Sequence, residues 1–416
     1  MSKATMMPQD RRRAIVIGGS MSGLFAAHLL LRQGWDVNVH ERISAELAGR
    51  GAGIVTHDEL FDVLRLCGVD SEAARIGVAV TGRRVFAGDG TIVGEHALPQ
   101  ILTSWGHLYG LLRQAMPEGC YHHGVELDSL TVSDSGVEAH FSNGSTARAD
   151  LLIGADGIFS TVRRQLLPQV APSYVGYIAW RGLVDEADLS AGTRAALFDS
   201  FAFSLPPGEQ MLGYPVAGAD EAMEPGRRRY NFVWYRPAAP GTVLRELLTD
   251  VDGVQHELSI PPNKIRPAVC REMRTAARRL LSPQFAEVVE ATRQPFIQAI
   301  QDLETSQMAI GDRVALIGDA AFVARPHVGM GVTKAASDAL VLVGALADSG
   351  GDIGRALRVF EASRLPYGRA VIKRARDLGA YMQAQLLTDE ERQLAERHRR
   401  PEAVMAETAV ASGIAA

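Results

Sequence analysis

The stretch AIVIGGSMSG, residues 14–23, decides the fold. Its apolar part, Ala14–Ile17, runs directly into glycines, which is typical of a buried parallel strand that leads into a helix. Residues from Leu24 to Arg32 have helical character and stop before Gly34, and the alternating segment Asp36–His40 predicts a second strand. The chain is therefore predicted to begin with a strand–helix–strand unit, and the fold class to be α/β with mixed α+β parts.

The glycine turn resembles a dinucleotide-binding loop. Gly18 and Gly23 take two glycine positions of a GxGxxG pattern, and Ser20 takes the middle one. Such a turn lets backbone N–H groups and a helix N-terminus approach a pyrophosphate, and the serine hydroxyl can donate to a phosphate. Glu41 follows about 20 residues later, where an acid binds ribose hydroxyls. A turn with a purely structural role is the alternative, and Glu41 favours the dinucleotide.

Two more apolar segments end in an aspartate. In LLIGADG, residues 151–157, Asp156 enters a glycine-flanked turn, although a helix-capping role is also common for such a residue. In ALIGDAA, residues 315–321, Asp319 could accept hydrogen bonds from a sugar-like chain. A glycine-rich turn then opens a long apolar helix at Gly331, and the helix dipole there favours a negatively charged ligand.

Other regions have clear local patterns. A hairpin is expected around Asp89-Gly90, a three-stranded meander over 125–150, and a mostly antiparallel sheet in the aromatic-rich region 172–236. One helical stretch is expected over 268–290, with further helices to about Arg399. The small and polar end, 401–416, is expected to be frayed.

Composition narrows the function classes. The 416 residues are 47% hydrophobic and 22% charged, as in an ordinary globular protein, and the formal net charge of -5 argues against nucleic acid as a partner. The three cysteines, Cys67, Cys120 and Cys270, form no CxxC pair, so neither a disulfide framework nor a metal site is predicted. No apolar run is long enough for a membrane span. We expect a cytoplasmic protein.

Four segments together resemble one protein family. They are IGGSMSGL at 17–24, YIAWRGL at 177–183, NFVWYR at 231–236 and ALIGDAAFVARPHVG at 315–329. In this order they are similar to the class A flavoprotein aromatic hydroxylases, which have the para-hydroxybenzoate hydroxylase fold. The resemblance runs from about Ala14 to Leu386, and the serine in the glycine turn and the Arg-Pro-His sequence are typical of the pyridinediol hydroxylases within that family.

The resemblance implies a Rossmann-like FAD-binding domain with an inserted antiparallel-sheet substrate domain and C-terminal helices. The implied FAD-binding parts are 1–80, 105–171 and 296–385. A hairpin at 81–104 would join the substrate domain at 172–295, and 386–416 would hold a C-terminal helix and the frayed tail.

The resemblance also implies contacts to non-covalent FAD. Gly18, Ser20 and Gly23 would surround the pyrophosphate. Glu41 and Arg42 would hold the adenosine ribose, and the backbone of Val125 would touch the adenine.

For the other half of the cofactor, Asp156 would serve both FAD and the nicotinamide cofactor, and Asp319 would bind the ribityl chain. The remaining implied contacts lie against the isoalloxazine: Gly51, Gly53, Pro326, Gly329 and Gly331.

The implied reaction uses NADH, with NADPH as the alternative, and O2, and proceeds through a flavin C4a-hydroperoxide. The substrate would be a small hydroxylated ring, such as the pyridinediol 2,6-dihydroxypyridine, attacked beside an ionised hydroxyl. His327 is the first candidate for a polar group at the substrate, because it follows Pro326 and an imidazole titrates near neutral pH. Tyr214 is the second candidate. A loop histidine and an ordinary sheet aromatic are the structural alternatives.

Other functions stay open at this point. A benzenoid phenol or a hydroxypyridine acid could replace the pyridinediol. A halogenase or hydride-only reductase could use the same fold, and a flavin-binding protein could lack turnover. A plain nicotinamide dehydrogenase is disfavoured because it needs only one dinucleotide motif. Whether the chain forms a homodimer is also left open.

Overall fold

The first of the two large sheets has six strands in the order β16-β17-β10-β1-β2-β6. The structure, a computed structural model, describes residues 11–47, 53–70, 72, 76–261, 263–382 and 388–411. All neighbouring strands in this sheet are parallel except β16 and β17. The strands are β1 (Arg13–Ile17), β2 (Asp36–Glu41), β6 (Tyr121–His123), β10 (Leu151–Gly154), β16 (Ala309–Ile310) and β17 (Val314–Leu316). The expected strand–helix–strand start is confirmed.

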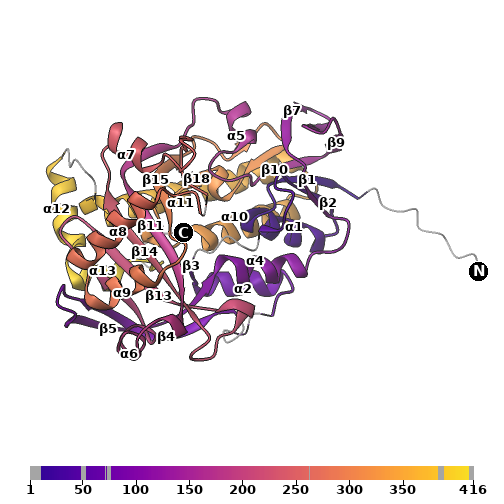
Figure 1. The fold of residues 1–416 in the computed structure, drawn as a ribbon. Helices are drawn as coiled ribbons and strands as arrows, with labels where there is room; N and C mark the ends of the chain where they lie inside the picture. The colour runs from indigo at the N-terminus through magenta and orange to yellow at the C-terminus, as the bar shows by residue number, and fades with distance from the viewer. Residues whose placement is uncertain are drawn as a thin grey trace, which may run out of the picture.

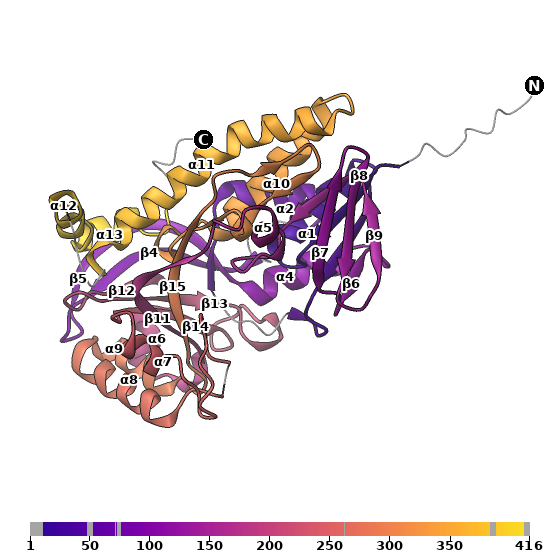
Figure 2. The same ribbon diagram turned by 90° about the horizontal axis from the view of Figure 1, so that it is seen from above.

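Helices cover one side of this sheet and a small β-sheet covers the other (Figure 2). On the helical side are α1 (Met21–Arg32), α2 (Asp58–Leu66), α4 (Trp105–Gln114) and α10 (Gly331–Asp348). The small sheet is the expected meander, made of β7 (Leu127–Ser133), β8 (Gly136–Phe141) and β9 (Thr146–Ala149). Both layers contribute to one hydrophobic core around the parallel strands.

The second sheet has nine strands in the order β18-β15-β11-β14-β13-β12-β4-β5-β3, and lies beside the first part of the molecule (Figure 1). Its pairs are antiparallel except β12 with β4. The expected hairpin is formed by β4 (Val78–Phe86) and β5 (Ile92–Ser104). The other strands are β3 (Gly53–Val55), β11 (Ser173–Asp185), β12 (Ser200–Ser204), β13 (Gln210–Val216), β14 (Arg229–Pro237), β15 (Phe296–Glu304) and β18 (Phe322–Val323).

The two faces of the nine-stranded sheet have different neighbours. Side chains alternate along each strand, so Trp180 and Trp234 point to the face covered by α8 (Pro267–Leu280) and α9 (Pro283–Ala291). The opposite face turns toward the first sheet. The stretch expected to be helical over 268–290 is helical except at residues 281–282. It is two helices, because Pro283 begins α9 and its ring prevents α8 from continuing.

The C-terminal helices connect the two parts of the molecule. The helix α11 (Ile353–Gly379) runs from beside α10 to the far end of the nine-stranded sheet (Figure 2), where α12 (Asp389–His398) and α13 (Pro401–Glu407) follow. The expectation of a frayed end from residue 401 is wrong for α13, because Val404 and Met405 are buried against the sheet. Shorter helices are α5 (Thr161–Leu166), α6 (Ala191–Leu197) and α7 (Thr242–Leu247). None of the helices in the described ranges is long and apolar enough to cross a membrane.

Candidate active site

The three motifs meet at one edge of the parallel sheet. Strands β17, β10, β1 and β2 run in the same direction, so their carboxyl ends are neighbours. Gly18 follows β1, Asp156 follows β10, Asp319 follows β17, and Glu41 ends β2. Ligands of open α/β sheets bind at such an edge.

Close packing explains the glycines of the first motif. Gly18 has φ of 101°, and a Cβ at this position would lie 2.4 Å from the carbonyl oxygen of Ala155. A Cβ on Gly23 would lie 1.9 Å from the Gly18 carbonyl oxygen. Ser20 occupies the N-cap of α1 without a side-chain capping bond. The turn therefore presents an uncapped helix N-terminus with a hydroxyl beside it, which suits a phosphate.

Glu41 holds the same turn from the next strand. Its buried carboxylate accepts hydrogen bonds from the Gly19 amide at 2.9 Å and the Ile43 amide at 3.0 Å. The backbone of Val125 donates to the Glu41 carbonyl at 2.9 Å, so these two residues are adjacent. Arg42 is exposed beside them. The turn after β1, the end of β2 and the backbone of Val125 before the meander are therefore adjacent.

Asp156 caps a helix in this structure. Its carboxylate accepts hydrogen bonds from the Ser160 hydroxyl at 2.5 Å and the Thr161 amide at 2.7 Å, at the start of α5. Burial raises the pKa of the Asp156 carboxyl, and the bond from Ser160 opposes that shift. The adjacent Arg163 donates to the Ala320 carbonyl at 2.8 Å. The second motif therefore supports the third through α5.

Asp319 lies at the rim of a cavity. Burial of the carboxyl among protein atoms raises the pKa of Asp319, and the charge of Lys334 opposes that shift. The side chain is nevertheless accessible to solvent, because it opens into the cavity. The turn behind it is fixed by a buried network. Lys334 Nζ donates to the Gly318 carbonyl at 2.8 Å, and Asp338 accepts from the Gly318 amide at 3.0 Å.

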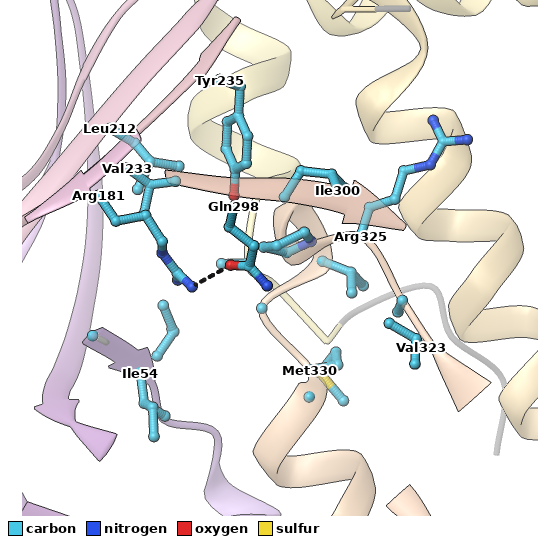
Figure 3. A pocket seen from close by; sticks show the side chains of 18 of the residues that line it. Ile54, Arg181, Leu212, Val233, Tyr235, Gln298, Ile300, Val323, Arg325 and Met330 are labelled. Atoms are coloured by element: carbon cyan, nitrogen blue, oxygen red, sulfur yellow. Dashed lines mark hydrogen bonds between the residues drawn. The ribbon is translucent and has the colours of Figure 1, made fainter. Parts of the chain in front are cut away.

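The cavity has a volume of about 250 Å³ and lies between the two sheets. The turn Pro326–Gly331 forms one wall, from the first part of the molecule. Aromatic and aliphatic side chains of the nine-stranded sheet form the other, among them Phe201, Leu212, Tyr214, Val233 and Tyr235. Ile54 and Met330 lie below Leu212, Val233 and Tyr235 in Figure 3. Gly53 also lines the cavity, whereas Gly51 is outside the described residues.

Gly331 and Gly329 differ in their surroundings. Apart from its chain neighbours and its own helix backbone, no atom of the described residues lies within 4 Å of a Cβ placed on Gly331, the first residue of α10. Gly329 instead has φ of 65°, and its Cβ would lie 2.6 Å from the Cβ of Ala409. Open space at the N-terminus of α10, with Asp319 and Pro326 beside it, fits a flat anionic ring system.

Two polar side chains project into the cavity from neighbouring strands. Arg181 on β11 donates through Nη1 to the Gln298 side-chain oxygen on β15 at 3.1 Å (Figure 3). Arg325 also lines the cavity, but its guanidinium turns away and is paired with Asp302 at 3.0 Å. Arg181 therefore presents its guanidinium toward a ligand in the cavity, and the Gln298 amide lies beside it.

Tyr214 and Tyr235 line the cavity and are buried. Burial raises the pKa of both phenols, and Arg181 opposes the shift. Both hydroxyls are therefore neutral near neutral pH and can donate a hydrogen bond to a ligand.

His327 lies behind the cavity wall. Its ring nitrogens contact the Gln210 side-chain oxygen at 3.1 Å and the Tyr177 hydroxyl at 2.9 Å. Burial and the charge of Arg325 lower its pKa to about 3. A neutral imidazole has one donor and one acceptor nitrogen, and these two partners satisfy both. The imidazole is therefore enclosed by residues of the nine-stranded sheet and does not face the cavity.

Sequence reasoning missed several lining residues. Gln298 is a polar residue in an otherwise apolar stretch of β15, which is a weak signal. Arg181 directly follows Trp180 in β11, so the alternation of side chains along the strand could have predicted that it faces the opposite side of the sheet, toward the cavity. Thr408 and Ala409 also line the cavity, and no local pattern predicts that.

These features agree with what the chain resembles. Residues 11–235 match a family described as FAD binding domain, and residues 174–302 match one described as FAD binding domain-like. The chain belongs to this FAD-binding family and is an FAD-dependent aromatic monooxygenase of class A.

Particular relatives share most of the chain. It is 33% identical to 2,6-dihydroxypyridine 3-monooxygenase of Paenarthrobacter nicotinovorans, over 89% of this chain and 91% of the relative. It is 29% identical to 3-amino-4-hydroxybenzoate 2-monooxygenase of Streptomyces cremeus, over 90% of this chain and 88% of the relative. The solved structure of 2,6-dihydroxypyridine-3-hydroxylase from Arthrobacter nicotinovorans superposes with a TM-score of 0.84, covering 89% of this chain and 93% of that one.

Proposed function

We propose that the protein hydroxylates a small hydroxylated aromatic ring, with a pyridinediol such as 2,6-dihydroxypyridine as the first candidate, using NADH and O2. The observation that carries this proposal is the cavity of about 250 Å³ between the Pro326–Gly331 turn and the aromatic sheet. Its lining joins the turn assigned to the flavin with the aromatic face of the sheet, so a flat ring bound on that face would lie beside the flavin. The reaction balances as ring C–H plus O2, NADH and a proton giving ring C–OH, water and the oxidised nicotinamide.

The residues at the carboxyl edge fit FAD. In this proposal Gly18, Ser20 and Gly23 surround the pyrophosphate, because the uncapped start of α1 lies there. The adenosine lies at the end of β2, where it contacts Glu41, Arg42 and the Val125 backbone.

At the flavin end, Asp319 binds the ribityl chain, and the ring lies against Gly53, Pro326, Gly329 and Gly331. The open space at Gly331 supports this assignment. Asp156 caps α5 and thereby shapes this edge of the parallel sheet. In this proposal Asp156 serves both FAD and the nicotinamide cofactor. Gly51 remains a proposed contact from the sequence alone.

When bound, the flavin accepts a hydride from the nicotinamide and activates O2 for the transfer of one oxygen atom. The chain supplies a dry and oriented site for this chemistry. Leu212, Val233 and Ile300 exclude water from one side, and the Thr408–Ala409 segment closes another. Water exclusion favours oxygen transfer over the release of peroxide.

Tyr214 and His327 have different proposed roles. Tyr214 faces the cavity with a neutral hydroxyl, so it donates a hydrogen bond to a ring substituent. His327 does not line the cavity, and it acts as a positioning residue through Tyr177 and Gln210. It thereby holds Pro326 and the start of α10 against the sheet.

A benzenoid phenol or a hydroxypyridine acid is the alternative substrate, because relatives of both kinds exist. One is named 3-amino-4-hydroxybenzoate 2-monooxygenase and another 6-hydroxynicotinate 3-monooxygenase. The test is NADH oxidation by the purified, FAD-loaded protein against a panel of pyridinediols, hydroxypyridine acids and phenols, with product masses recorded. Strongest stimulation by a pyridinediol, with one oxygen added, supports the proposal. Activity confined to benzenoid rings would refute the pyridine assignment.

A further inference from the structure

Arg181 is the cavity-lining cation that carries no carboxylate partner among the described residues. It lies on the cavity face of β11, one position after the buried Trp180. The second lining arginine, Arg325, is neutralised by Asp302 through Nε and Nη2. The two guanidiniums are therefore in different electrostatic situations, although both belong to the cavity wall.

The contacts of Arg181 leave its charge uncompensated. Nη1 donates to the neutral Gln298 amide oxygen, and the carbon of the guanidinium lies 5.9 Å from the centre of the Phe296 ring. Nε is buried and has no hydrogen-bond partner within the described part of the chain. A partly desolvated cation without an anion is unfavourable, and an anionic ligand beside it would offset that cost.

Within the described part of the chain, the other titratable groups that face the cavity do not supply a base. Tyr214 and Tyr235 have raised pKa values and are neutral acids. Asp319 belongs to the opposite wall, at the cofactor end. His327 is enclosed behind the wall by Tyr177 and Gln210. Oxygen transfer needs a ring enriched by an ionised hydroxyl, so its ionisation requires another cause.

We propose that Arg181 binds the ionised ring oxygen of the substrate, and that its positive charge, instead of a protein base, favours loss of the hydroxyl proton to solvent. This deepens the proposed function and rests on it. The O–H bond breaks, its electron pair stays on the ring oxygen, and the proton passes to solvent water. The Gln298 amide beside Arg181 is placed to contact the neighbouring ring substituent.

The substrate class follows from this pairing. It is a flat ring with a hydroxyl that ionises beside the carbon to be attacked, and pyridinediols and acidic phenols both qualify. Methyl ethers do not qualify, because they cannot place a negative oxygen at the guanidinium. An opposite charge within hydrogen-bonding distance lowers the pKa of a hydroxyl by about 1–3.

The test measures ionisation of a bound ligand without turnover. Fluorine NMR follows 4-fluorophenol bound to the FAD-loaded protein, with NADH omitted, across a pH series. The parent protein is expected to lower the pKa of the bound phenol, Arg181→Lys to keep most of that effect, and Arg181→Gln to raise the pKa by about 1 or more. Binding of 4-fluoroanisole serves as the control, since Arg181→Gln should weaken it far less than the at least tenfold loss expected for the phenolate.

Two results would overturn the inference. One is a bound phenol with the same pKa in the parent protein as in water. The other is an equal pKa in the parent and Arg181→Gln proteins, with FAD content confirming that both are folded. The first needs no variant, so a failure of Arg181→Gln to fold does not protect the inference. Failure of the proposed function is distinct, because it appears as no substrate-stimulated NADH oxidation by the parent protein.

Discussion

Arg83 donates through Nη1 to the main-chain carbonyl of Thr408 at 2.6 Å and thereby joins β4 to the end of the chain. The same nitrogen donates to the Met405 carbonyl at 2.7 Å. The guanidinium is buried, and burial lowers the pKa of Arg83 to about 9. Ala409, one residue further, donates to the His327 carbonyl at 2.7 Å. The segment that Arg83 holds therefore contributes Thr408 and Ala409 to the active-site wall.

Replacing Arg83 with methionine should release this segment. Loss of hydrogen bonds to a charged donor is expected to cost about 1.5–3 kcal/mol of unfolding free energy. Hydrogen exchange should become faster at residues 404–409 before it changes in β1 or β10. Arg84→Met is the matched control, because the neighbouring Arg84 contacts Glu95 and the Ala196 carbonyl instead of the segment at 405–409. Equal exchange in the two variants would show that Arg83 does not hold the segment.

Asp319→Asn should weaken FAD retention by about tenfold or more, because a charged acceptor for the ribityl hydroxyls is lost. Glu41→Gln should do the same from the adenosine end. Asp156→Asn is expected to lower the melting temperature with a smaller change in FAD affinity, since its carboxylate caps α5. FAD dissociation constants and melting curves check this together. Unchanged affinity in both Asp319→Asn and Glu41→Gln would refute the cofactor assignment.

Gly331→Leu should weaken FAD binding without destabilising the fold, whereas Gly329→Ala should mainly reduce stability. A side chain on Gly331 enters open space, so the apoprotein should stay folded while FAD binding falls at least tenfold. A methyl group on Gly329 meets Ala409 and a left-handed backbone, so stability should fall by about 1–3 kcal/mol. Thermal unfolding of the apoproteins and FAD titration separate these effects. Full FAD affinity in Gly331→Leu would place the flavin elsewhere.

His327 should reduce stability in acid without setting the pH dependence of catalysis near neutral pH. Its pKa falls from 6.5 to about 3 on folding, so the unfolded chain binds more protons between these values. The stability contribution of neutral His327 is therefore complete above pH 6.5 and is lost as the pH falls toward about 3.

Urea unfolding of the parent and His327→Gln proteins at several pH values checks this prediction, and the variant should lose less stability on acidification. A parallel pH profile of turnover should keep its shape near neutral pH. A shifted neutral limb in His327→Gln would instead make His327 the titrating group at the substrate.

Local sequence patterns were sufficient to predict the parts of the site that are formed by short segments. Three signals are each visible within a few residues: the strand before Gly18, the acid at Glu41 and the strand before Asp319. All three lie at one sheet edge. Parallel neighbours and a glycine turn impose that arrangement once the three segments form strands.

Non-local contacts were not predictable in the same way. His327 lies in a suggestive turn, but only the tertiary structure places Tyr177 and Gln210 around its ring. The small residues near Ala409 indicate a loose end, yet a buried arginine from β4 holds them. The position of Arg181 in the cavity was not predictable either, because it depends on which face of the nine-stranded sheet packs toward the parallel sheet.

The central claim is that this chain places an activated oxygen on a hydroxylated ring held between the Pro326–Gly331 turn and the aromatic sheet. The most direct measurement is mass spectrometry of the product after turnover with NADH and isotopically labelled O2, over the panel of pyridinediols and phenols. We predict a product that carries one labelled oxygen atom, formed in proportion to the NADH consumed. NADH consumption that yields only peroxide, with no labelled ring product from any member of the panel, would contradict the claim.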